Sequence, residues 1–61
     1  MLYENIKKVC MAKGISINQI EKELGFARSS LSKWEKHSPS VRSLKKVSDY
    51  LGVTIDELLA E

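Results

Sequence analysis

Three side chains that can donate hydrogen bonds to the base edges of DNA lie close together near the middle of the chain. They belong to Arg28, Ser29 and Lys33. An arginine guanidinium can form two hydrogen bonds with one guanine, a lysine ammonium can reach guanine or phosphate, and a serine hydroxyl can bond to either kind of acceptor. In a helix these residues would share one face with Ser32, because positions three and four apart lie side by side. The pattern therefore supplies hydrogen-bond donors of the kinds that contact with a DNA groove requires.

The helix that would present these residues is expected from Ala27 to Lys36. Phe26 and Leu31 have the spacing of the hydrophobic pair that flanks a helix start. Leu31 and Trp34, three positions apart, would form an apolar face opposite to the polar one. Trp34 could instead stack on a base, but its place on the apolar face favours a core role.

A second short helix is expected just before it, over about two turns that end at Gly25. Ser16 can accept a hydrogen bond from the backbone N–H of Gln19, whose side chain can reach back, and this pair is a capping box. Ile15 and Ile20 flank the start as a hydrophobic pair. Gly25 can take the left-handed conformation that often ends a helix. Two short helices joined by a tight, glycine-containing turn describe a helix-turn-helix.

With these residues in place, the sequence resembles the Xre/Cro-like helix-turn-helix domain of temperate-phage repressors and many small bacterial regulators. The resemblance covers nearly the whole chain and rests on Ile20, Leu24, Gly25, Phe26, Leu31, Trp34, Glu35 and the stretch from Pro39 to Leu59. It implies a compact, all-α, five-helix domain like that of lambda repressor. The sequence departs from the family pattern at Glu21, where a small alanine is usual, and at Ala27, where a serine or threonine cap is usual. It also departs at Cys10, where an arginine is frequent.

The resemblance also implies a function and a binding surface. The expected function is a sequence-specific transcriptional regulator, with repression favoured, that inserts the helix 27–36 into the major groove of a double-stranded DNA operator. Arg28, Ser29 and Lys33 would contact bases. Residues expected to contact phosphate are Asn18, Gln19, Ser32, Lys36, His37, Ser38, Ser40 and Arg42. For His37, an ordinary exposed loop residue is an equally good interpretation.

The distribution of charge supports this surface more than the net charge does. The 61 residues carry a formal net charge of only +2, which many proteins without a nucleic-acid partner share. Between Arg28 and Lys46 there are six basic residues and one acid, whereas the chain after Lys46 has four acids and no base. This asymmetry predicts a positive side that runs through the second motif helix and into the next helix. The alternative is a solvated polar face with no partner.

Three further helices are expected to support the motif. The first covers about residues 2–13, and the fourth lies between a Ser40 cap and a Gly52 stop. A short fifth helix follows Thr54, which can form a capping box with Glu57. The residues predicted to face the core are Leu2, Ile6, Val9 and Cys10 in the first helix and Val41, Leu44, Val47 and Leu51 in the fourth.

Glu21 lies where two tightly crossed helices would meet. Burying its charge there would be costly. Its carboxylate is therefore expected to turn outward or to pair with a basic side chain, that of Lys22, Lys33 or Arg28. Cys10 is expected to be a small core residue, because the chain has a single cysteine and offers it no cluster of metal ligands.

Length and composition limit the remaining function classes. The chain is expected to be a single domain, residues 1–61, with 43% hydrophobic residues and no apolar run long enough to span a membrane. The single cysteine and the charged N-terminus fit a reducing cytoplasm rather than secretion. No enzyme, metal, cofactor or small-molecule ligand is predicted, because there is no phosphate-binding glycine loop, no nucleophile with a base and no ligand cluster.

Two alternatives stay open at this level. A protein-interaction or antitoxin-like module, with weak or secondary DNA binding, is the rival of a regulator that reads DNA sequence. The chain can also act as a homodimer, as a monomer or as a fragment of a larger regulator, and Tyr50 and Leu59 are candidates for contact between two copies. A dimer would predict two half-sites about 34 Å apart on one face of the duplex.

Overall fold

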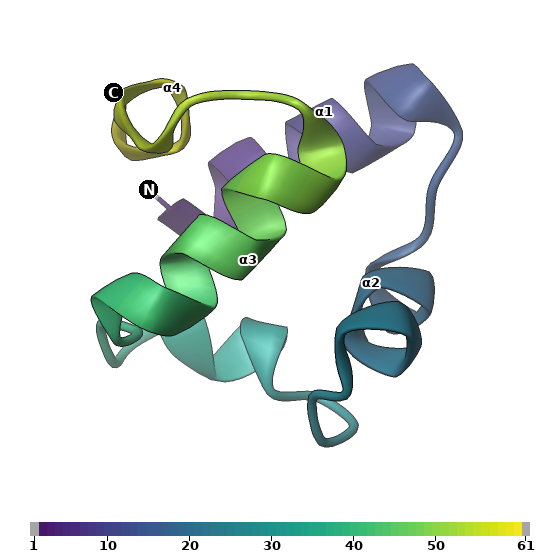
Figure 1. The fold of residues 1–61 in the computed structure, drawn as a ribbon, viewed down its shortest axis with the longest axis vertical. Coiled ribbons are helices and arrows are strands. Elements are labelled where there is room, and N and C mark those ends of the chain that lie inside the picture. Colours follow the sequence, from purple (N-terminus) through teal and green to yellow (C-terminus); the bar gives the residue numbers. More distant parts are fainter. Residues whose placement is uncertain (1, 61) are drawn as a thin grey trace.

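The computed structural model describes residues 2–60 as an assembly of short helices around one core (Figure 1). Four are α-helices and one is a 3-10 helix, in the order α1 (Leu2–Lys13), α2 (Ile17–Leu24), η1 (Leu31–Glu35), α3 (Val41–Leu51) and α4 (Ile55–Leu59). The predicted all-α class is confirmed, although one of the five expected helices, the second of the motif, is a 3-10 helix. Met1 and Glu61, which the single-domain expectation includes, lie outside the described residues.

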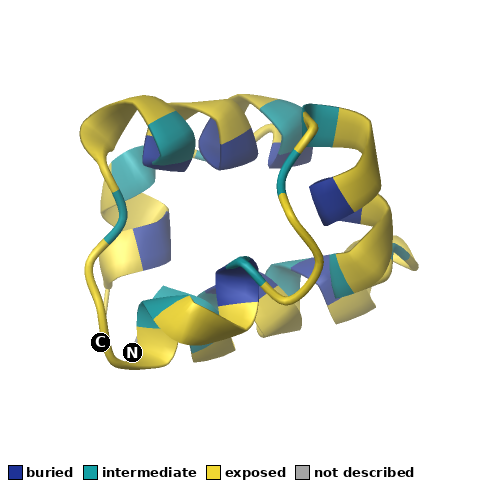
Figure 2. Cartoon of the chain, turned by 90° about the horizontal axis from the view of Figure 1, so that it is seen from below, coloured by how far each residue is buried: buried dark blue, intermediate teal, exposed yellow. Residues whose placement is uncertain are grey.

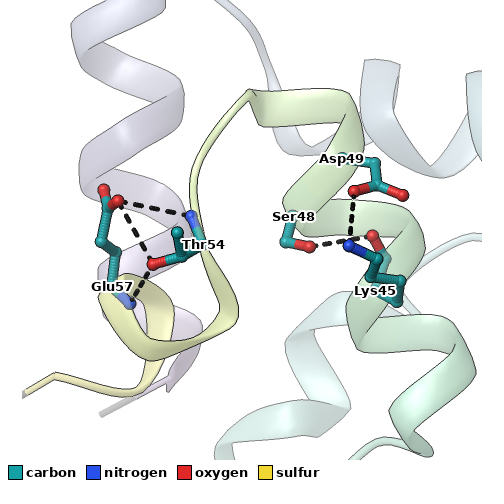
Figure 3. Close-up of polar contacts among 5 residues, drawn as sticks. All are labelled: Lys45, Ser48, Asp49, Thr54 and Glu57. Carbon is teal, nitrogen blue, oxygen red and sulfur yellow. Dashed lines mark hydrogen bonds and ion pairs between the residues drawn. The ribbon is translucent and has the colours of Figure 1, made fainter.

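Three helices begin at the predicted caps. The side-chain oxygens of Ser16, Ser40 and Thr54 each accept a hydrogen bond from the backbone N–H three residues later, at 3.0, 3.2 and 3.0 Å. Thr54 and Glu57 form the complete capping box, because the Glu57 carboxylate also accepts from the Thr54 N–H (Figure 3). At Ser16 only half of the expected box forms, since no hydrogen bond returns from the Gln19 side chain within residues 2–60. Local polar contacts thus determine where α2, α3 and α4 start.

The chain reverses direction after α2 at Gly25, as predicted. Its φ of 75° is left-handed, a conformation that residues with a Cβ avoid. The N–H groups of Gly25 and Phe26 then donate to the carbonyls of Lys22 and Glu21, at 3.4 and 2.8 Å. This closure ends α2 and directs the following residues back toward it. Gly52 ends α3 in the same way, with a φ of 72°.

Every helix contributes at least one side chain to a single hydrophobic core. The buried apolar residues are Ile6, Cys10, Ile20, Leu31, Leu44, Val47, Leu51 and Leu58. Figure 2 shows that the buried positions of the helices face one another across the interior. The helices have only 5 to 12 residues, too few for stability in isolation, so burial of this shared apolar surface holds them in place.

Val41 is the exception to the predicted core. Its side chain is 76% exposed, although it lies three residues before the buried Leu44 on the same helical face. Val41 is the first residue of α3, and the first turn of this helix extends past the part that is packed. Ser48 takes a core position instead, and its hydroxyl is satisfied within α3 because it donates to the Lys45 carbonyl at 2.9 Å (Figure 3). A periodic pattern identifies a face, but not how far along it the packing reaches.

The Asn5 side chain links the first and last α-helices by hydrogen bonds, in addition to their shared core. The Asn5 amide donates to the carbonyl of Leu58, at 2.8 Å, and to that of Ala60. These carbonyls lie at the end of α4, where a helix leaves its last acceptors without partners of its own. In Figure 1, α4 and α2 lie at opposite corners of the molecule. The α1–α4 contact therefore closes the core on the side away from α2.

Candidate nucleic-acid interface

The segment expected to be the second motif helix, residues 27–36, is part turn and part 3-10 helix. Residues 28–30 form a turn, and η1 begins only at Leu31. Ser29 has a φ of 67°, and a right-handed helix cannot pass through a left-handed residue. The predicted α-helical bounds are therefore wrong, and the helical part of this segment is η1. Residues 28–31, which are the turn and the first residue of η1, are together called the motif turn below.

The carboxylate of Glu21 holds the motif turn from α2. One oxygen, Oε1, accepts from the Ser29 N–H and the other, Oε2, accepts from the Leu31 N–H, each at 3.1 Å. Glu21 is only 3% exposed and its carboxylate binds backbone N–H groups, so the prediction that it turns outward or pairs with a basic side chain is wrong. Its burial is tolerated because two backbone donors of the turn replace the water that the carboxylate loses.

Two apolar side chains fasten η1 to the core. Leu31 is fully buried and Trp34 packs against the buried cluster, which confirms the predicted inward face. The Trp34 ring lies against that of Phe26, with centroids 6.2 Å apart and planes inclined by 58°. Trp34 is thus a packing residue, as the sequence favoured. Lys33, between these two anchors, is exposed to solvent.

The residues predicted to contact bases and phosphates are all exposed. Arg28 and Ser29 lie in the motif turn, and Lys33 lies on η1. The phosphate candidates lie at the start of α2, on or just after η1, in the connector before α3 and at the start of α3: Asn18, Gln19, Ser32, Lys36, His37, Ser38, Ser40 and Arg42. In Figure 1 the motif turn, η1 and the connector follow one another along one edge of the molecule.

Two of the serine candidates already use their hydroxyls inside the protein. Ser32 donates to the Ser29 carbonyl at 2.8 Å. The Ser40 hydroxyl donates to the Ser43 hydroxyl at 3.1 Å while its oxygen caps α3. Phosphate oxygens accept hydrogen bonds, so each serine would have to break an internal bond before it could donate to a phosphate. The cationic side chains are therefore the stronger candidates.

A hollow of about 290 Å³ lies between α2 and the motif turn. It is lined by Asn18, Glu21, Lys22, Phe26 and Arg28. The structure thus brings a predicted phosphate contact, Asn18, close to a predicted base contact, Arg28. Lys22 is not among the contacts predicted from the sequence. Lys22 follows Asn18 by four residues and so lies on the same face of α2. This spacing could have identified it from the sequence as a further phosphate contact.

The arrangement of α2, the motif turn and η1 agrees with a comparison against protein families. The family model described as helix-turn-helix matches residues 6–58, which is most of the chain. The chain belongs to the helix-turn-helix family. This result and the similarity to named helix-turn-helix regulators confirm the Xre/Cro-like resemblance.

Curated helix-turn-helix regulators are similar to most of the chain. BcrR of Enterococcus faecalis, named a transcriptional activator, is 37% identical over 59 residues, covering 93% of the chain and 29% of BcrR. SinR of Bacillus subtilis, named a transcriptional regulator, is 36% identical over 64 aligned positions, covering 100% of the chain and 58% of SinR. SlrR of the same organism, also a regulator, is 51% identical over 49 residues, covering 75% of the chain and 32% of SlrR.

The chain spans less than two thirds of the length of each of these relatives. Their similarity therefore applies to their helix-turn-helix parts. No solved structure gave a significant match to the chain.

The basic residues near the helix-turn-helix motif divide into two groups. Lys45 pairs with Asp49 at 3.1 Å on the surface of α3 (Figure 3), and Lys46 lies over the Phe26 ring, 6.0 Å from its centroid. Within residues 2–60, the other basic residues between positions 28 and 46 form no ion pair: Arg28, Lys33, Lys36 and Arg42. The charges of these four residues are not neutralised by any carboxylate in the described part of the chain and are available to a phosphate backbone.

Three further features of the described residues concern metal ligands, the cysteine and membrane-spanning helices. Residues 2–60 contain no group of three or more histidine, cysteine, aspartate or glutamate side chains placed to hold a metal ion. Cys10 is a buried free thiol, as predicted, and burial raises the pKa of this thiol and keeps it protonated. None of the helices in the described part of the chain has the length and apolar character needed to cross a bilayer.

Proposed function

We propose that this helix-turn-helix chain binds double-stranded DNA in a sequence-specific way, as the DNA-binding part of a cytoplasmic transcriptional regulator. The observation that supports this most is the presentation of Arg28, Ser29 and Lys33. All three are exposed on a short segment whose opposite side is anchored in the core by Leu31. Side chains that read bases need such a rigid support, because a small displacement weakens a hydrogen bond to a base edge.

In the proposed complex, the motif turn and η1 enter the major groove. Arg28 donates two hydrogen bonds to one guanine, and Ser29 and Lys33 contact neighbouring base edges. Asn18, Gln19, Lys22 and the basic and polar residues from Lys36 to Arg42 contact phosphates on either side of the groove. The hollow that Asn18, Lys22 and Arg28 share lets base and phosphate contacts form side by side.

Repression is the proposed mode of regulation, because a domain that occupies a promoter needs no surface beyond the one that binds DNA. Activation would require a further contact with the transcription machinery. A reporter gene placed behind the selected site distinguishes the two, since expression falls with a repressor and rises with an activator.

The test of DNA binding is selection from a random double-stranded DNA library at about 150 mM salt, where non-specific phosphate contacts are weak. Enrichment of one short sequence is the expected result. An enriched inverted repeat would mean that two copies bind together, with Leu59, which is 52% exposed, as a candidate for their contact. A single half-site would mean binding as a monomer. No enrichment would contradict the proposal and favour a protein-interaction module.

A further inference from the structure

We propose that Glu21 is a positioning residue for base recognition: its buried carboxylate sets the conformation of the motif turn and so the direction in which Arg28 and Ser29 are presented. This inference rests on the proposed function. With 3% of its surface exposed, Glu21 makes its contribution through the turn rather than by touching DNA.

Glu21 supplies the acceptors that the motif turn lacks locally. Its two oxygens take the N–H groups of Ser29 and Leu31, each at 3.1 Å, and neither N–H has a backbone carbonyl partner within residues 2–60. A helix start usually obtains such an acceptor from its own cap. Ala27 has no side-chain oxygen, and the Ser30 hydroxyl donates to the Ala27 carbonyl and does not cap η1. The cap of η1 therefore comes from α2.

The bond to Ser29 acts on a backbone that would otherwise favour another conformation. Ser29 is the only non-glycine residue within residues 2–60 with a positive φ, at 67°. Residues with a Cβ disfavour this region, so neighbouring contacts must hold the residue there. A charged acceptor forms stronger hydrogen bonds than a neutral one, and the Glu21 carboxylate meets this need.

The bond to Leu31 determines where η1 begins. The Leu31 side chain is fully buried while its N–H is bound to Glu21, so this residue is held on two sides. Arg28 precedes these two held residues and Lys33 follows them. Without the carboxylate, the turn gains alternative conformations and the Arg28 guanidinium loses its fixed approach to the groove.

The test compares Glu21→Gln with Glu23→Gln. Glutamine has the shape of glutamate, but its NH₂ group cannot accept, so one of the two turn N–H groups loses its partner. Glu23 is exposed on the same helix, and its variant makes the same change of charge. Amide hydrogen exchange is measured at Ser29 and Leu31. We expect exchange at one or both of these amides to be roughly tenfold faster in Glu21→Gln, and unchanged in Glu23→Gln.

Base preference is measured on the same proteins by selection from a random DNA library. In Glu21→Gln, the preference at the base pair that depends on Arg28 should flatten, while affinity for random DNA stays within about twofold because the phosphate contacts remain. If Glu21 served only to stabilise the fold, its loss would lower the affinity for the selected site and the affinity for random DNA together. If Glu21→Gln matches Glu23→Gln in exchange and in base preference, the inference is overturned.

A second variant covers the case in which Glu21→Gln does not fold. The double variant Glu21→Gln with Ser29→Gly relieves the backbone strain, because glycine adopts a positive φ freely. It is compared with Ser29→Gly alone. A flatter preference at the Arg28-dependent base pair in the double variant supports the inference, and equal preferences overturn it. If the wild-type chain selects no sequence, the proposed function and the readout role both fail, whereas a failure confined to the variants concerns Glu21 alone.

Discussion

The carboxylate of Glu21 on α2 accepts a hydrogen bond from the backbone N–H of Leu31 at 3.1 Å, across ten residues of sequence. The same carboxylate binds the Ser29 N–H, eight residues away. A charged side chain thus joins the two elements of the helix-turn-helix motif at a position where the resemblance implies a small alanine. The joint between α2 and η1 is therefore polar and directional rather than a close contact between small residues.

Replacement of Arg28 by alanine should weaken binding to the selected DNA site by roughly 1 to 3 kcal/mol and relax specificity at one base pair. The reason is that a guanine edge loses its two-bond partner while the phosphate contacts remain. Fluorescence anisotropy with the selected site and its single-base variants measures the effect. Lys8→Ala, on the exposed face of α1, is the control for loss of one positive charge. An Arg28→Ala variant with unchanged base preferences would show that this assignment is wrong.

Replacement of Lys36 or Arg42 by alanine should weaken binding to all DNA sequences alike. Each change should also lower the slope of log K against log salt by about one unit, because one fewer counterion is released. Lys45→Ala is the matched control, since Lys45 already pairs with Asp49, and it should change the slope less. Titrations at several salt concentrations give the slopes. A change in base preference, rather than in overall affinity, would contradict a phosphate role.

Replacement of Gly25 by alanine should lower the free energy of unfolding by about 1 to 2 kcal/mol. A Cβ at Gly25 would meet no atom within 4 Å, so the cost comes from the left-handed backbone, with its φ of 75°, and not from a clash. Gly25→Asn is the control, because asparagine tolerates this conformation better and should cost less. Urea denaturation followed by circular dichroism measures both. Equal losses for the two variants would point to a cause other than φ.

The Cys10 thiol should make the protein less stable at alkaline pH. Burial raises the pKa of this thiol, so the folded state keeps its proton at a pH where the unfolded chain has lost it. The unfolded state then binds fewer protons, and the free energy of unfolding falls as the pH rises above about 8.5, the ordinary pKa of a cysteine. Below that pH the thiol adds no pH dependence.

The measurement is urea denaturation between about pH 7 and pH 10, on the wild type and on Cys10→Ala. All other ionisable groups are the same in both proteins, so the difference between the two curves isolates the thiol. The wild type should lose more stability than the variant over the alkaline part of the range. Parallel curves would show that Cys10 ionises equally in the folded and unfolded chains.

The helix boundaries of this protein were predictable wherever the deciding contact is local. Ser40 and Thr54 cap their helices through an N–H only three residues away, and Gly25 and Gly52 end helices through their own φ. Such contacts depend on residue type and spacing, both of which are visible in the sequence. The all-α class and most of the core face follow from the same local signals combined with apolar periodicity. The family was predicted from the resemblance and shown by the comparison with known proteins.

The exposure of the candidate contact residues was predictable from the sequence, but the backbone conformation that carries them was not. All the predicted contact residues are exposed, but the segment that carries Arg28 and Ser29 is a turn rather than an α-helix. Its local sequence has no strong helix breaker, so spacing alone favoured a continuous helix. The roles of these residues in binding DNA stay predictions that the variants above address.

The sequence by itself determined the starts of α2, α3 and α4, the ends of α2 and α3, the membership in the helix-turn-helix family and the exposed basic character of the motif. Only the tertiary structure decided that Glu21 is buried, that Ser29 is left-handed and that Val41 is exposed. The physical reason is how far apart in the sequence the residues of the deciding contact lie. A cap or a glycine acts within about four residues, whereas the partners of Glu21 lie eight and ten residues away and meet it only after α2 and η1 pack on the same core.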